Sequence, residues 1–351
     1  MNIRIAFALV ALLALPLAAA CDGGDGSSPA SEPSSTATAG ASPSGGGSTP
    51  TAAPTATEAA PDEPTPTATS NAVAGAAAGG LACELGPSAA FPVGETTNAT
   101  IVSGGRERTF LIYVPGGYEG SSAVPLVLNF HGLGSNGSQQ HVYAGLVPIA
   151  EREGFIVVSP DGVNNSWLIT PGVNDIEFTR DLVAAVSEGL CIDPGAVFST
   201  GMSNGGFMSA ALACVAGDLV AAVAPVAGVL GPSANCGEPV PLLQFHGTDD
   251  AVVPYEGGTI SATGGPFGGI DAIMLGWAEH NGCSLVPGTS EASDSVDLVT
   301  FEGCDAETAH YVVDGGGHTW PGGPAVPRLG PTTTEISASE LMWEFFLQNR
   351  R

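Results

Sequence analysis

Ser203 lies between Gly201 and Gly205 in the sequence Gly-Met-Ser-Asn-Gly. In a nucleophile elbow, a serine occupies a strained turn between a strand and a helix, and glycines flank it because side chains there would collide with neighbouring backbone. The pattern alone is weak in a chain with 50 glycines, where a glycine-rich turn with a surface serine is the plainer interpretation. An apolar run precedes the motif, however, and a helix-like stretch, 207–213, follows it. We therefore predict that Ser203 is a nucleophile that attacks a carbonyl carbon.

The base that would activate this serine is predicted to be His318. A serine hydroxyl needs a base to remove its proton, and in this architecture the order along the chain is serine, acid, histidine. His318 lies in a glycine-rich loop, 315–323, after a predicted last strand, and loops often carry catalytic groups. His280 ends a predicted helix and His310 opens a predicted strand, so we interpret both as structural.

Two adjacent carboxylates, Asp249 and Asp250, are candidates for the acid that orients the base. Both follow a predicted buried strand, 241–245, and catalytic groups in doubly wound folds lie just beyond the carboxyl ends of strands. At this point either carboxylate could be the acid, and an exposed turn residue is the alternative interpretation of Asp249. His246, at the end of the same strand, is interpreted as structural.

The oxyanion of an acyl-transfer intermediate also needs backbone N–H donors. Asn204, directly after the nucleophile, is expected to supply one. The second is expected from the loop 129–135, whose glycines let the backbone approach a substrate, and the amide of Leu133 is the candidate. His131 is interpreted as a residue that holds this loop in place.

Short apolar runs alternate with helical patterns from residue 81 onward. Continuous runs such as Leu126-Val127-Leu128 indicate strands that are buried on both faces of a parallel sheet. The predicted strands are 109–114, 125–130, 155–159, 196–200, 221–226, 241–245 and 310–313. The predicted helices are 138–153, 176–190, 204–213, 269–281 and 334–349. This alternation predicts a single α/β-hydrolase domain, with a doubly wound, mostly parallel sheet and helices on both faces.

The N-terminal part of the chain is interpreted as targeting and linker sequence. Residues 1–20 combine Arg4 with a short apolar stretch and small residues before Cys21, as in a signal peptide. They also resemble a bacterial lipobox with one extra alanine, so Cys21 is a candidate lipid anchor, and a freely secreted protein is the alternative. Residues 21–80 are mostly Ser, Thr, Pro, Ala and Gly, and we expect a disordered linker. The expected catalytic domain, 81–351, would be extracellular or attached to the cell envelope.

The chain has seven cysteines, and an exported protein rarely keeps a free thiol. If Cys21 carries a lipid, six cysteines remain for disulfides. Short loops favour the pairs Cys214–Cys236 and Cys283–Cys304, which leaves Cys83–Cys191. Sequence alone does not choose among the possible connectivities.

The formal net charge is −27, and all eight basic residues are arginines. Because the phosphates of nucleic acids and anionic membranes would be repelled, this charge argues against both as partners. A lipid tether at Cys21 would be the only expected link to a membrane. The net charge does not indicate whether a neutral ester is a substrate.

These segments together resemble a known family, the secreted feruloyl and acetyl-xylan esterases (carbohydrate esterase family 1) and the related polyhydroxybutyrate depolymerases, which include lipoprotein members. In the family's acid motif the carboxylate lies four residues after a histidine, which selects Asp250. The base motif around His318 is the most specific of the matches, and the spacing of Cys283 and Cys304 is also similar. The matching segments are 131–132, 201–206, 246–255 and 317–322.

The resemblance implies ester hydrolysis through an acyl-enzyme, with no metal or cofactor. Ser203 would attack the ester, and His318 would take its proton and pass it to the leaving alcohol. Trp320 and Trp167 are candidate residues of the acyl pocket, and simple packing is the alternative for each, favoured for Trp167. The implied substrates are feruloyl or acetyl esters of plant polysaccharide, or alternatively polyhydroxybutyrate chains, and we expect a monomer.

Two other classes of function remain as alternatives. One is a different enzyme on the same fold, such as an envelope acyltransferase or a serine peptidase. The other is a surface binding protein on an inactive scaffold. Because all three triad positions hold suitable residues, the sequence argues against an inactive scaffold.

Overall fold

The computed structural model describes residues 83, 85–86 and 88–351. The predicted signal peptide (1–20), the predicted linker (21–80) and Cys21 lie outside the described residues. Within the part of the chain that is described, no helix has the length and apolar character that crossing a bilayer would require.

The described residues form strands and helices that alternate along the chain. The strands are β1 (Thr96–Ser103), β2 (Arg106–Tyr113), β3 (Val124–Phe130), β4 (Ile156–Pro160), β5 (Ile192–Met202), β6 (Ala222–Val226), β7 (Leu242–Gly247), β8 (Gly258–Thr259), β9 (Pro266–Phe267), β10 (Gly288–Ser293), β11 (Val296–Thr300) and β12 (Thr308–Val313). The helices are α1 (Gly137–Tyr143), α2 (Leu146–Glu153), α3 (Asp175–Gly189), α4 (Asn204–Val215), α5 (Ile270–His280) and α6 (Ala338–Gln348), with short 3₁₀ turns η1 (Val163–Asn165) and η2 (Pro327–Leu329).

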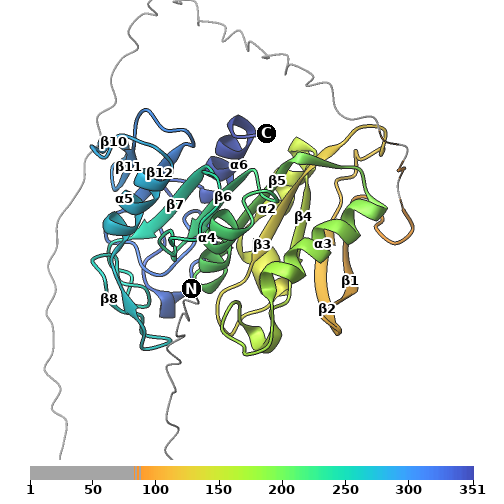
Figure 1. The fold of residues 1–351 in the computed structure, drawn as a ribbon, viewed down its shortest axis with the longest axis horizontal. Helices are drawn as coiled ribbons and strands as arrows, with labels where there is room; N and C mark the ends of the chain where they lie inside the picture. Colours follow the sequence, from red (N-terminus) through yellow and green to blue (C-terminus); the bar gives the residue numbers. More distant parts are fainter. Residues whose placement is uncertain (1–82, 84, 87) are drawn as a thin grey trace, which may run out of the picture. The chain divides into compact units, whose positions relative to one another are not determined.

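Ten strands form one sheet in the order β1-β2-β4-β3-β5-β6-β7-β12-β11-β10 (Figure 1). The central strands from β4 to β12 pair in parallel. The pairs at both edges are antiparallel. Because the central strands run in the same direction, the loops that follow them meet at one edge of the sheet.

Helices cover both faces of the sheet, and each face has its own hydrophobic core. On one face, α3, α4 and α5 contribute buried residues such as Phe178, Leu212 and Trp277. On the other face, α2 and α6 contribute Ile149 and Trp343. Every residue of β4 and of β6 is buried, which explains why these strands are continuous apolar runs. The predicted doubly wound α/β fold is confirmed.

The structure differs from the sequence-based expectation in one helix and in several short or exposed strands. The helix predicted over 138–153 is two helices, because Gly145 adopts a left-handed conformation (φ 62°) between α1 and α2. Strands β1, β8, β9, β10 and β11 are not predicted. β1 and β10 carry many exposed polar residues, β8 and β9 have two residues each, and the exposed Asp297 interrupts the apolar residues of β11. The other predicted elements are present, with ends shifted by a few residues.

Three disulfides join the six described cysteines: the two pairs that short loops favour and the third pair that these leave. Cys214–Cys236 and Cys283–Cys304 connect positions 22 and 21 residues apart. Cys83–Cys191 connects positions 108 residues apart and ties the start of the described chain to the sheet. Disulfides persist in oxidising compartments, so this set is typical of an exported protein.

Candidate active site

Ser203 lies in a sharp turn between β5 and α4. Its backbone has φ 56° and ψ −114°, a strained conformation for a residue with a side chain. The backbone oxygen of Phe130 on the neighbouring strand leaves no room for a Cβ atom at Gly201 or Gly205. The Ser203 N–H donates to the Val226 carbonyl at 2.8 Å, which fixes the turn against β6. The segment therefore has the geometry of a nucleophile elbow.

Asp250 and His318 are brought together from loops that follow β7 and β12. The Oδ2 atom of Asp250 lies 2.7 Å from Nδ1 of His318. The other carboxylate oxygen, Oδ1, accepts backbone N–H bonds from Val252 and Val253, both at 2.8 Å. With both oxygens engaged, the carboxylate has one orientation, and it holds the imidazole in one orientation as well.

A second histidine, His246, also contacts this carboxylate. Its Nε2 lies 3.2 Å from Asp250 Oδ2 and 2.8 Å from the Val253 carbonyl oxygen. Gln244 Nε2 lies 2.8 Å from His246 Nδ1, and it also donates to the Phe245 carbonyl. Gln244 therefore donates to Nδ1, so Nε2 of His246 carries a proton and donates toward Asp250 and Val253. His246 supports the acid and is more than a strand-end residue.

The surroundings of Asp250 keep it ionised. Burial by itself would raise the pKa of Asp250, but hydrogen bonds from His246 and His318 outweigh burial and hold the pKa well below its usual range. Asp249, by contrast, is exposed, and only its backbone N–H is engaged, with the Gly316 carbonyl at 2.9 Å. The structure thus brings Asp250 to His318 and leaves Asp249 at the surface.

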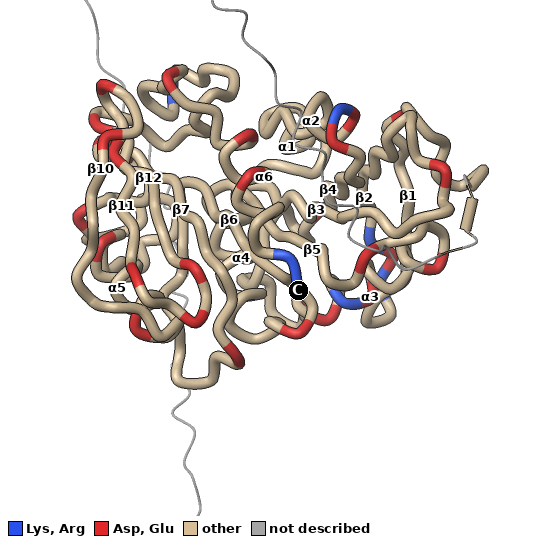
Figure 2. Tube along the Cα trace, turned by 90° about the horizontal axis from the view of Figure 1, so that it is seen from above, with Lys and Arg blue, Asp and Glu red and all other residues tan. Residues whose placement is uncertain are grey.

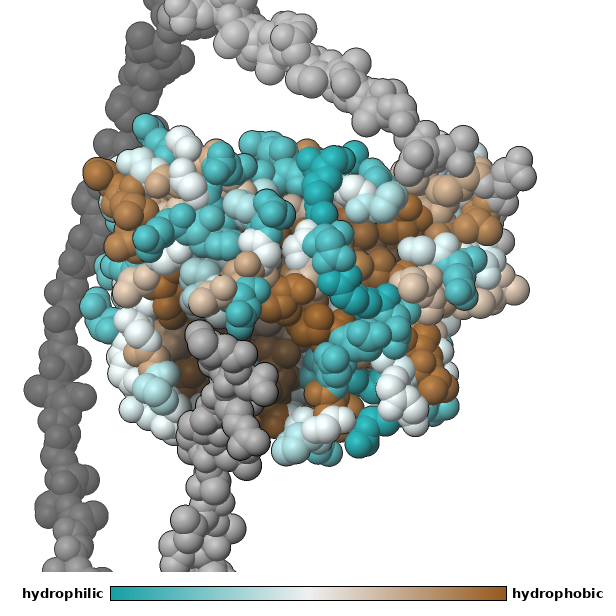
Figure 3. Space-filling view, viewed as in Figure 1, coloured by the Kyte–Doolittle hydropathy of each residue, from teal (hydrophilic) through white to brown (hydrophobic). Residues whose placement is uncertain are grey.

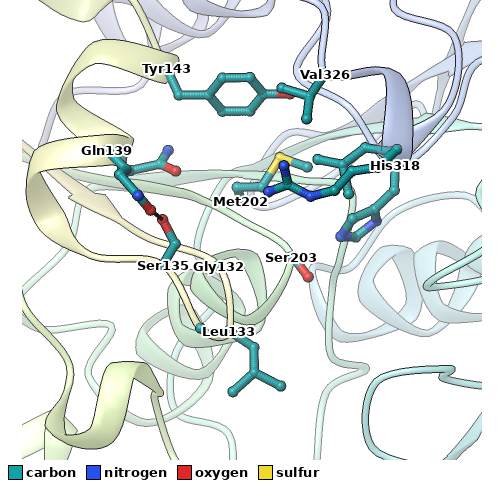
Figure 4. A pocket seen from close by; sticks show the side chains of 13 residues that line it. Gly132, Leu133, Ser135, Gln139, Tyr143, Met202, Ser203, His318 and Val326 are labelled. Carbon is teal, nitrogen blue, oxygen red and sulfur yellow. Dashed lines mark hydrogen bonds between the residues drawn. The ribbon is translucent and has the colours of Figure 1, made fainter.

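Ser203 and His318 line the same cavity, which has a volume of about 340 Å³ (Figure 4). Because Nδ1 of His318 contacts Asp250, the other ring nitrogen, Nε2, is the one available to the Ser203 hydroxyl. No hydrogen bond joins these two described side chains, and such bonds often close only when substrate binds. Leu133, a predicted oxyanion-hole residue, lines the same cavity.

His131 holds the loop that carries Leu133. Its Nε2 accepts the Gly162 N–H at 2.9 Å, which leaves Nδ1 to donate to the Gly132 carbonyl at 2.8 Å. Burial lowers the pKa of His131, which favours this neutral form. The Gly134 N–H donates to the Asn165 carbonyl at 2.8 Å and anchors the far side of the loop. His131 thus has the supporting role that the sequence indicates.

Trp167 connects this loop to the nucleophile elbow. Its indole N–H donates to the His131 carbonyl at 2.9 Å, and its backbone N–H donates to the Asn204 side-chain oxygen at 2.7 Å. The ring is fully buried and packs against Phe130 and Phe178. Trp167 therefore packs in the core, as the plainer interpretation expects, and it also lines a second cavity beside Ser203, so its role in an acyl pocket stays a prediction.

Trp320 lines neither of the two cavities that Ser203 borders, which corrects the expectation that this residue contacts the acyl group. Its side chain is fully buried in the core beneath α6, and its indole N–H donates to Ser339 Oγ at 2.9 Å. Its backbone N–H donates to the Tyr143 hydroxyl at 3.2 Å. Trp320 supports the His318 loop from inside the protein.

Ser203 also borders the second cavity, which has a volume of about 330 Å³. Its wall is largely apolar and includes Leu168, Phe207 and Val253, and both Ser203 and Asn204 border it. Figure 3 shows brown, hydrophobic surface around a hollow in the face of the molecule beside the β8 segment.

Sequence reasoning missed a buried ion pair beneath this cavity. Arg108 Nη2 lies 3.1 Å from Asp175 Oδ1, and the guanidinium stacks over the Phe178 ring at 3.6 Å. The other Asp175 oxygen accepts the Leu168 N–H at 2.8 Å and holds a left-handed residue (φ 63°) at the cavity wall. Only the mixture of charge and apolar residues in β2 and at the start of α3 hints at such a pair.

The remaining histidines after Ser203 lie outside the site. His310 contacts Asp271, with 3.3 Å between Nε2 and Oδ1, and His280 ends α5. No group of three or more potential metal ligands is found among the described residues.

Comparisons with known proteins place the chain in a family. The chain is 31% identical over 291 residues to feruloyl esterase D of Neurospora crassa, covering 77% of this chain and 91% of that protein. It is 30% identical over 229 residues to feruloyl esterase B of Piromyces equi, and there it spans only 42% of the relative's length. No protein-family model matches the chain.

A solved structure shows the same fold. The acetyl xylan esterase from Aspergillus awamori superposes with a TM-score of 0.53 at 17% identity, covering 71% of this chain and 98% of that one. Together the fold and the relatives define a carboxylic ester hydrolase of the serine hydrolase class. The chain belongs to the feruloyl esterase family.

Proposed function

We propose that Ser203, His318 and Asp250 form the catalytic triad of this esterase. The observation that carries the proposal is the 2.7 Å contact between Asp250 Oδ2 and His318 Nδ1, because it directs Nε2 of the histidine toward the cavity that Ser203 lines. This arrangement matches the roles of acid, base and nucleophile in acyl transfer.

The reaction would proceed in two halves. Ser203 Oγ attacks the ester carbonyl while His318 Nε2 takes its proton, and His318 then gives that proton to the leaving alcohol. In the second half, His318 activates a water molecule that attacks the acyl-enzyme, and the carboxylic acid product leaves Ser203. The backbone N–H groups of Leu133 and Asn204 would donate to the oxyanion in both halves.

The two cavities around Ser203 suggest where each part of the ester binds. The leaving alcohol must lie within reach of His318, which lines the first cavity and not the second. The acyl group would then enter the second, apolar cavity between Leu168 and Phe207. An apolar cavity of this volume suits an aromatic acyl group such as feruloyl better than an acetyl group.

The polar lining of the first cavity suits a hydroxylated alcohol. Ser135 donates to Gln139 Oε1 at 2.8 Å, and the Tyr143 hydroxyl borders the same space (Figure 4). A sugar unit of a polysaccharide offers hydroxyls that can hydrogen-bond to such groups. We therefore propose feruloyl esters of polysaccharide as the substrate class.

A panel of esters tests this function. Methyl ferulate, acetylated xylan, p-nitrophenyl acetate and hydroxybutyrate oligomers would be compared by kcat/KM. The proposal predicts that methyl ferulate is hydrolysed with the highest kcat/KM among the small esters. A clear preference for hydroxybutyrate oligomers would contradict it and favour a polyester depolymerase.

The cellular location is a further part of the proposal. The six described cysteines pair with one another, which leaves Cys21 as the seventh cysteine of the chain. This pairing supports a catalytic domain that is exported and tethered to the cell envelope by a lipid on Cys21, and we propose that the domain is a monomer. The mass of the mature N-terminal peptide tests the tether: a diacylglyceryl-modified Cys21 is expected, and an unmodified N-terminus would contradict it.

A further inference from the structure

The cavity that Ser203 and His318 share has one permanently charged side chain in its wall, that of Arg328. None of the residues that line this cavity is an Asp or a Glu, although the chain has 35 acidic and only eight basic residues. Figure 2 shows acidic residues distributed over the surface and basic residues at few places. The site therefore presents a positive charge in a strongly negative protein.

Arg328 has no carboxylate partner within the described part of the chain. Three other arginines pair with nearby carboxylates: Arg108 with Asp175, Arg152 with Glu153 and Glu340, and Arg180 with Asp218. Arg328 makes no such pair, and its side chain is exposed to the cavity and solvent. Its fork of N–H donors is available to an anion, which it can bind through two parallel hydrogen bonds.

The segment that carries Arg328 is fixed against the loop of the proposed base. The carbonyl of Leu329 accepts the His318 N–H at 2.7 Å, and the carbonyl of Pro331 accepts the Gly317 N–H at 2.9 Å. Tyr143 lines the same cavity, where burial raises the pKa of its hydroxyl while the Trp320 N–H and, to a smaller extent, the charge of Arg328 lower it. The positive charge is held beside the proposed leaving-group site.

We propose that Arg328 binds a carboxylate on the alcohol part of the substrate, so that the enzyme prefers esters whose alcohol is an acidic sugar or another hydroxy acid. The inference rests on the proposed function, because it takes the first cavity as the site of the leaving alcohol. An anionic group there would be attracted locally by Arg328 against the repulsion of the rest of the protein. Arg328 would thus set specificity without taking part in bond making or breaking.

Two esters that differ chiefly in charge test the proposal. Feruloyl glycolate carries a carboxylate on its alcohol part, and feruloyl glycolamide has a neutral amide of nearly the same shape. The ratio of their kcat/KM values would be compared between wild type and Arg328→Gln, so that intrinsic differences in ester reactivity cancel. We expect Arg328→Gln to lower kcat/KM for the glycolate ester roughly 3–10-fold while the glycolamide ester changes little.

Arg350→Gln is the matched control, because it removes the same charge from an exposed arginine that lines a different cavity. This variant should leave the ratio at the wild-type value, and added salt should reduce the effect of Arg328→Gln. If Arg328→Gln changes both esters equally or neither, Arg328 does not select a carboxylate and the inference is overturned, while the proposed function stands. If wild type hydrolyses neither ester, the proposed function fails, and the role of Arg328 fails with it.

Discussion

Asp250 Oδ2 lies 2.7 Å from His318 Nδ1, although the two residues are 68 positions apart. The contact joins the loop after β7 to the loop after β12, and these strands are neighbours in the parallel part of the sheet. The relation between the two residues therefore follows from strand order: adjacent parallel strands deliver their following loops to the same place.

The adjacent aspartates give a matched pair of variants. Asp250→Asn should lower kcat for ester hydrolysis roughly 10,000-fold, because an amide favours the wrong imidazole tautomer and cannot stabilise the imidazolium. Asp249→Asn should change kcat less than about threefold, because the Asp249 side chain is exposed. Steady-state kinetics with methyl ferulate would measure both, and a larger loss in Asp249→Asn would show that the acid is misassigned.

The lowered pKa of Asp250 predicts a pH dependence of stability. Because the folded-state pKa lies below the unfolded value of about 3.9, ionised Asp250 contributes stability that is fully present above that value. The contribution is lost as the pH falls toward the folded-state pKa. Urea unfolding of wild type and Asp250→Asn should show a difference in unfolding free energy that shrinks from pH 5 to pH 2. A difference that grows as the pH falls would show that Asp250 is not stabilised in its ionised form.

His246 is predicted to be a positioning residue. In His246→Phe, Asp250 loses the donor at 3.2 Å, so the pKa of Asp250 should rise and its stabilising contribution should be lost at higher pH than in wild type. We also expect kcat to fall roughly 10-fold or more, because the carboxylate is less firmly held. His280→Phe, at the end of α5, is the control. Equal acid stability profiles in His246→Phe and wild type would argue that His246 only fills space.

The three disulfides should differ in how much they stabilise the domain. Cys83–Cys191 closes a segment of 108 residues, whereas Cys283–Cys304 closes one of 21. By chain entropy, loss of the long-range bridge should lower the free energy of unfolding by about 4–5 kcal/mol and loss of the local one by about 3 kcal/mol. Urea unfolding of the two double cysteine-to-alanine variants would measure this order. A larger loss for the Cys283–Cys304 variant would indicate that strain or residual structure dominates over loop length.

Local sequence signals account for the parts of the site that depend on short-range geometry. The elbow around Ser203 could be predicted because the strained turn demands glycine at Gly201 and Gly205, whose neighbours leave no space for a Cβ atom. The central strands could be predicted because burial on both faces makes them continuous apolar runs.

Features that depend on tertiary packing could not be predicted in the same way. A tryptophan beside the base motif could face the cavity or the core, and only the packing of α6 buries Trp320 and pairs it with Ser339. The contact of His246 with Asp250 depends on a turn that brings residues four apart face to face, so the spacing alone does not reveal it. Arg328 lies ten positions after His318 in a segment rich in proline and glycine, and no local pattern marks it as part of the cavity wall.

Labelling with a fluorophosphonate tests most directly whether Ser203 is an activated nucleophile, because this reagent reacts only with a serine whose hydroxyl a neighbouring base activates. Intact-protein mass spectrometry should show one added phosphonyl group on wild type and on the control Ser290→Ala, an exposed serine of β10, and peptide mapping should place it on Ser203. Ser203→Ala should remain unlabelled, and His318→Ala should react far more slowly. Wild type that does not react, or Ser203→Ala that is labelled as fast as wild type, would contradict the account.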